Sequence, residues 1–127
     1  MMYASKSPAR EFSVGIRSIV VSHVADIELG ADEMITFTGP DAHEYDVVKK
    51  SWGYYATPSV DKRLPAYGLR AGLMRNIDTR HCFVVLVRDN ALDDWQSYMA
   101  DERQELVGWL DELTQDDNPK WGRRSDD

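Results

Sequence analysis

The apolar residues of this chain change their spacing near residue 88, and this change constrains the fold more than any other feature. Before it, apolar side chains alternate with polar ones or form short runs, as in 19–21 and 81–87, which is typical of strands. After it, they recur every three or four positions. This spacing predicts one long amphipathic helix over residues 91–113.

The predicted fold class is therefore α+β. Five or six strands would form a curved antiparallel sheet or a small, partly open β-barrel, and the C-terminal helix would cover one face or an open end. A chain of 127 residues fits one domain. We expect a flexible N-terminal arm over residues 1–11, a single globular domain over 12–114 and a frayed polar tail over 115–127, in which Trp121 could dock back on the domain.

Composition excludes several classes of protein. The net charge of −7 and the pI near 4.9 argue against general nucleic-acid binding, which usually needs a basic surface. No apolar run approaches the roughly 20 residues that span a bilayer, and the first residues lack the apolar core of a secretory signal. The single cysteine, Cys82, fits a reducing compartment, so we expect a cytoplasmic location.

Residues 45–76 form a local cationic segment in this acidic chain. Arginine supplies a planar fork for phosphate or carboxylate, and tryptophan and tyrosine offer flat rings with a polar edge. If the proline-containing loop 53–65 folds back over the strand before it, these groups would line one hollow. The predicted ligand-binding residues are Lys49, Lys50, Trp52, Tyr54, Tyr55, Arg63 and Arg70. The alternative is that the rings fill the core and the cations form a solvated face.

Candidates for catalysis are fewer. His43, Asp46 and His81 are the residues of a type suited to a general base. The three histidines lack the paired spacing of metal ligands, and the chain holds no CxxC motif, so we predict no metal and no cofactor. The GxSxG, P-loop and GxGxxG motifs are also lacking, which removes the common hydrolase, NTPase and dinucleotide interpretations.

Three functions follow as hypotheses. The first is a small binding or accessory module whose cationic, aromatic face holds an anionic small molecule (a phosphosugar, nucleotide or carboxylate) or an acidic protein surface. The second is a cupin-like isomerase or epimerase acting on a nucleotide-linked or phosphorylated sugar. The third is a structural partner protein that forms a homodimer through the helix 91–113, whose apolar stripe could be an interface.

Overall fold

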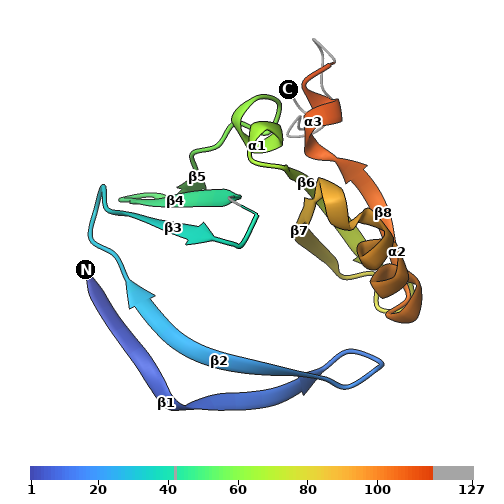
Figure 1. The fold of residues 1–127 in the computed structure, drawn as a ribbon, viewed down its shortest axis with the longest axis horizontal. Coiled ribbons are helices and arrows are strands. Elements are labelled where there is room, and N and C mark those ends of the chain that lie inside the picture. The colour runs from blue at the N-terminus through green and yellow to red at the C-terminus, as the bar shows by residue number, and fades with distance from the viewer. Residues whose placement is uncertain (42, 116–127) are drawn as a thin grey trace, which may run out of the picture. The chain divides into compact units, whose positions relative to one another are not determined.

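A computed structural model of the protein describes residues 1–41 and 43–115. Within them the elements are β1 (Met2–Val14), β2 (Ile19–Glu28), β3 (Met34–Thr38), β4 (Glu44–Lys50), β5 (Gly53–Ala56), α1 (Arg63–Ala66), β6 (Leu69–Asn76), β7 (Cys82–Arg88), the 3-10 turn η1 (Asp89–Ala91), α2 (Leu92–Asp101), β8 (Gln104–Trp109) and α3 (Leu110–Leu113). The strands form three antiparallel sheets (Figure 1). The chain divides into two compact units, Met1–Thr57 and Pro58–Asp127.

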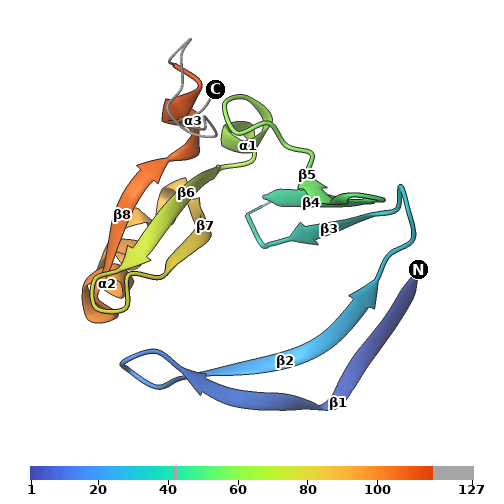
Figure 2. The same cartoon turned by 180° about the vertical axis from the view of Figure 1, so that it is seen from behind.

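The first unit begins with a long two-stranded ribbon made of β1 and β2, which run side by side in both views (Figures 1 and 2). A tight turn joins the strands, and its first residue, Gly15, has a φ of 79°, which glycine adopts without steric cost. The pairing is interrupted by a bulge in β1 between Ser5 and Arg10. In the described part of the chain, no third strand pairs with this ribbon.

A three-stranded meander in the order β3–β4–β5 completes the first unit. Its centre is Asp46 of β4, a buried carboxylate that accepts hydrogen bonds from the hydroxyls of Thr36 and Thr57. The backbone N–H of Thr57 also donates to the Asp46 carbonyl oxygen at 3.0 Å. Because a buried carboxylate is costly without donors, these contacts hold β3 and the end of β5 against β4.

The second unit is a sheet in the order β7–β6–β8 with α2 packed against one face (Figure 2). Trp95 of α2 meets Trp109 of β8 with ring centroids 5.2 Å apart, a separation at which tilted aromatic pairs attract. The buried apolar residues of this unit are Leu64, Leu69, Ala71, Met74, Val87 and Met99. They place its core between β6 and the helices α1 and α2.

The prediction of one long helix over residues 91–113 is wrong. α2 ends at Asp101, Arg103 adopts a left-handed φ of 52°, and the chain returns as β8, which pairs with β6. A left-handed residue stops a helix. Leu106 and Trp109 happen to continue the helical spacing of the apolar residues, although they lie in a strand that carries its own bulge.

The predicted α+β class with one curved sheet or partly open barrel is also wrong: the described part of the chain is mostly strand with only short helices, and its strands form three separate sheets, none closed into a barrel. Consecutive strands pair in β1–β2, β3–β4–β5 and β6–β7, whereas β2 does not pair with β3, nor β5 with β6. The stretch predicted to be a flexible arm, residues 1–11, lies largely in β1. The tail from residue 116 on, with Trp121, lies outside the described residues. None of the described helices is long and apolar enough to cross a membrane.

Candidate functional site

The predicted cationic, aromatic face is divided between the two sides of the β4–β5 pair. Lys49 lies opposite Tyr54 in the register, and its ammonium group sits 4.7 Å from the centre of that ring, within range of a cation–π interaction. Side chains of successive strand residues point to opposite faces. Lys50 therefore belongs to the other side, together with Tyr55, which pairs with Val48.

On that other side, Lys50 forms an ion pair with Asp32, and the hydrogen bond that its ammonium group donates to the Asp32 carboxylate raises the pKa of Lys50. The rings of Trp52 and Tyr55 stack with centroids 6.1 Å apart. Trp52 is 68% exposed and Tyr54 62% exposed, so both rings can meet a partner. The loop predicted over 53–65 begins as strand β5, because Tyr54 and Tyr55 continue the ladder with β4.

The two predicted arginines lie in the second unit. Arg63 is in α1, with its guanidinium 5.6 Å from the centre of the Tyr67 ring. Arg70 of β6 donates to both carboxylate oxygens of Asp111, at 2.8 and 3.1 Å, and lies 4.4 Å from the Trp109 ring. These hydrogen bonds hold the pKa of Asp111 below its ordinary value and raise the pKa of Arg70.

The catalytic candidates occupy three different settings. Nδ1 of His43 is buried without a hydrogen-bond partner, and the ring lies so close to Gly39 that a Cβ there would fall 2.0 Å from Cε1. Asp46 holds the meander together, as described above. His81 is exposed and precedes β7 in the second unit. Among the described residues, no three His, Cys, Asp or Glu side chains gather in a way that could hold a metal ion.

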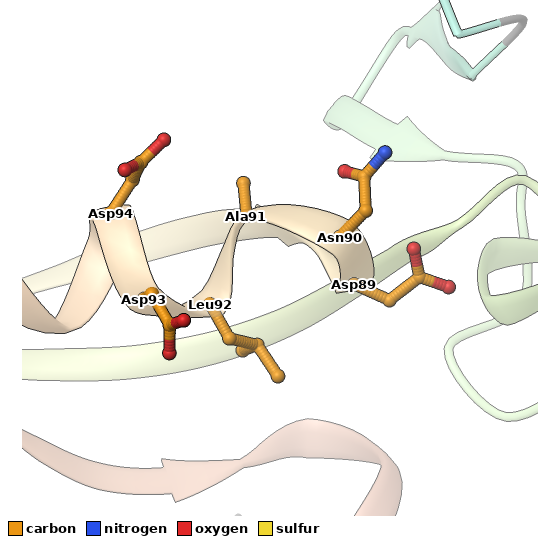
Figure 3. A pocket seen from close by; sticks show the side chains of 6 residues that line it. All are labelled: Asp89, Asn90, Ala91, Leu92, Asp93 and Asp94. Atoms are coloured by element: carbon orange, nitrogen blue, oxygen red, sulfur yellow. The ribbon is translucent and has the colours of Figure 1, made fainter.

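A hollow of about 460 Å³ lies at the start of α2 and is lined by Asp89, Asn90, Ala91, Leu92, Asp93 and Asp94. Figure 3 shows that its three carboxylates point in different directions rather than toward one centre. Carboxylates that hold a cation converge on it. The hollow is thus an acidic surface at the start of a helix, where the helix dipole favours negative charge.

The surface that sequence reasoning missed is one face of the β1–β2 ribbon. The register places Val14 opposite Ile19 and Phe12 opposite Val21. These four side chains share one face, which we call the apolar ribbon face, and each is between 37% and 40% exposed. The face continues beyond the bulge with the pair of Tyr3 and Ile27. The alternation 12, 14 and 19, 21 was the signal that could have revealed it.

The opposite face of the ribbon is more polar, although it also carries Val20 and Val24, each 60% exposed, and polar residues occupy the middle of the ribbon. Glu11 opposes Ser22, and Ser13 opposes Val20, so the far half of the ribbon has one apolar and one mainly polar face. At the bulge, Asp26 pairs with Lys6 at 2.9 Å and with His23 at 2.9 Å. The hydrogen bond from Lys6 lowers the pKa of Asp26. Such alternation is typical of a sheet with one face on a core and one in water.

No protein-family model, no curated protein and no solved structure matches the chain. The function is therefore argued from the chemistry and the exposure of these surfaces.

Proposed function

We propose that this protein is a structural subunit that assembles with further copies of itself through the β1–β2 ribbon. The observation that supports this function is the exposure of the apolar ribbon face: Phe12, Val14, Ile19 and Val21 lie side by side, and each is between 37% and 40% exposed. Contiguous exposed apolar surface of this kind marks interaction sites.

The energetics of a two-stranded ribbon point the same way. A lone hairpin is marginally stable in water, and strands need a third neighbour or a packed face for independent stability. Full burial of a valine, isoleucine or phenylalanine side chain contributes about 1.5–3 kcal/mol. The four residues of the apolar ribbon face are still 37–40% exposed, so covering them would gain part of this energy and add to the stability of two strands that bury none of their residues.

The charge of the ribbon favours contact between like copies. Residues 2–28 hold three basic side chains (Lys6, Arg10 and Arg17) and three acidic ones (Glu11, Asp26 and Glu28), so the ribbon carries no formal net charge. The whole chain carries −7, which would make copies repel one another at most other surfaces. The ribbon is therefore a surface at which two copies can meet without net charge repulsion.

This proposal changes the earlier hypothesis of a homodimer through the helix 91–113. That segment is split into α2, β8 and α3. Met99 and Trp95, which belonged to the predicted interface stripe, face the sheet of their own unit: Met99 is 7% exposed and Trp95 packs on Trp109. The ribbon takes the place of the helix as the proposed interface.

The test is sedimentation of the full chain over a wide range of concentrations, for the natural sequence and two variants. Val21→Asp places a charge on the apolar ribbon face, and we expect it to weaken association at least tenfold. Ser13→Asp on β1, the matched control on the opposite face, should leave association within about threefold. Far-ultraviolet circular dichroism checks that each variant keeps its strands. A natural chain that stays monomeric at high concentration would refute the proposal.

A second candidate function is the binding of an acidic protein surface or an anionic small molecule at the β4–β5 pair. The high exposure of Trp52 and Tyr54 beside two lysines favours it. Lys50 already pairs with Asp32 and Arg70 with Asp111, so an anion would have to compete with these carboxylates. A rise in melting temperature with polyglutamate that disappears in Trp52→Ala and weakens with salt would support it.

We propose no catalytic function, because His43, Asp46 and His81 offer no shared site that would carry the isomerase hypothesis. A reducing compartment stays our expectation for the chain.

A further inference from the structure

We infer that β2, and not β1, is the strand through which two copies join, and that it pairs antiparallel with β2 of a second copy. The product would be a four-stranded sheet in the order β1–β2–β2–β1 across a two-fold axis. This inference rests on the proposed assembly function and names the edge and the partner. It is carried by a difference between the two edges of the ribbon.

The outer edge of β1 is blunted. Its pairing with β2 shifts between Ser5 and Arg10, and such a bulge bends an edge away from further pairing. Pro8 lies inside the bulge and has no N–H to donate to a neighbouring strand. Lys6 adds a charge beside it. Bulges, prolines and lysines are the devices that keep an edge strand from joining another sheet.

The outer edge of β2 carries none of these devices. The strand runs for ten residues, IVVSHVADIE, without a proline, a glycine or a bulged residue of its own. Its first three residues are β-branched and favour extended backbone. Such a strand presents a row of N–H and C=O groups to any chain that can pair with it. Within the described residues β1 is the only strand that pairs with it.

The side chains of β2 suit a second copy of the same strand. Ile19, Val21 and Ile27 point to one face because they are separated by even numbers of residues. Directly opposed residues of antiparallel strands share a face. Every register that opposes odd-numbered residues to odd-numbered ones therefore joins two apolar ribbon faces into one surface, while a slip of one residue would turn them to opposite sides.

Charge selects the antiparallel direction. The acidic residues of β2, Asp26 and Glu28, lie at its C-terminal end, and Arg17 lies in the turn just before its N-terminal end. Antiparallel pairing brings the acidic end of one copy toward the arginine of the other, whereas parallel pairing would place the acidic ends together. Opposite charges across neighbouring strands stabilise a sheet, and like charges destabilise it.

The experiment measures distances between copies with nitroxide labels on the full chain. Cys82→Ser removes the natural thiol, and a single cysteine is then introduced as Ser22→Cys on β2 or as Glu11→Cys on β1. These residues are cross-strand partners on the same face of the ribbon, so they lie at the same position along the ribbon, and both are exposed. The register that sets Arg17 beside Asp26 and Glu28 puts the two-fold axis near residue 22, so the separation across the axis is one strand spacing at Ser22 of β2 and three at Glu11 of β1.

We expect label-to-label distances below roughly 15 Å at Ser22→Cys, and a separation about 10 Å larger at Glu11→Cys, because two strand spacings of about 4.8 Å are added. The reverse order of distances would show that β1 is the joining edge. Long distances at both positions in an oligomer would show that the ribbons meet by another surface. Both results overturn the inference and leave the assembly function standing. A monomeric mass would instead refute the proposed function.

Discussion

The β1–β2 ribbon and the β7–β6–β8 sheet are both built from strands rich in β-branched residues, but they differ in how deeply their side chains are buried. In the second unit, α2 covers one face of the sheet, and Met74, Val87 and Met99 are all at most 8% exposed. In the ribbon no residue of either strand is buried. β-branched alternation therefore predicts that a face is suited to burial, but it does not tell whether the covering layer comes from the same chain.

The largest expected effect tests whether α2 is a true covering layer. Met99→Ala removes a buried side chain from α2, and we expect a loss of about 2–5 kcal/mol in the free energy of unfolding. Met2→Ala in the ribbon, where Met2 is 67% exposed, should change the stability by no more than about 0.5 kcal/mol. Urea unfolding followed by tryptophan fluorescence measures both. Equal effects of the two substitutions would remove the contrast between the regions.

A second substitution tests how closely β8 packs on β6. A Cβ added at Gly72 of β6 would lie 2.9 Å from Cε3 of Trp109, so Gly72→Ala forces that ring to shift. We expect a cost of about 1–3 kcal/mol. Gly108→Ala in β8 is the matched control, because nothing lies within 4 Å of a Cβ there. Thermal unfolding compares the two, and a Gly72→Ala protein as stable as the control would contradict the close packing.

The smallest expected effect concerns Asp111, whose pKa is lowered chiefly by the hydrogen bond from Arg70. Because the folded-state pKa is depressed, the stabilisation is fully present above the ordinary aspartate pKa of about 3.9 and is lost as the pH falls through the lowered value. Since the pair is partly exposed, Asp111→Asn should cost at most about 1 kcal/mol at pH 7.

The difference between Asp111→Asn and the natural chain should shrink toward zero on acidification, which urea unfolding at a series of pH values measures. Asp61→Asn, an exposed aspartate in the turn before α1, is the control and should show no such trend. A difference that stays constant with pH would mean that Arg70 and Asp111 do not form this pair in solution.

Local features of the fold were accessible to sequence reasoning. The run 81–87 is, within one residue, β7, because short β-branched runs bounded by turn residues have few other solutions. The helix 91–113 failed because Leu106 and Trp109 fit helical spacing by coincidence, while the left-handed Arg103 that ends the helix leaves no mark in apolar periodicity. Sheet membership failed because pairing depends on contacts distant in sequence.

In the candidate site, too, the sequence predicts local features but not contacts between residues that are distant in sequence. The position of Lys49 and Lys50 on opposite faces of β4 follows from strand alternation alone and could be predicted from the sequence. The ion-pair partners of Lys50 and Arg70 could not be predicted, because they are distant in sequence: Asp32 lies in a turn 18 residues before Lys50, and Asp111 lies 41 residues beyond Arg70. The apolar ribbon face was missed because Ser5, Ser7 and Pro8 predicted a loose N-terminal arm. In the structure this stretch is the bulged part of β1.

The ribbon also has a consequence for the order of events during synthesis. All of its cross-strand pairs lie within residues 2–28, and a hairpin closes in about 1–10 μs, whereas translation adds about 5–20 residues each second. We therefore expect the ribbon, which is the proposed interface, to be complete while the second unit is still unmade. Neighbouring nascent chains on one messenger would then meet ribbon first, and subunits would find their partners on the polysome before their own cores exist.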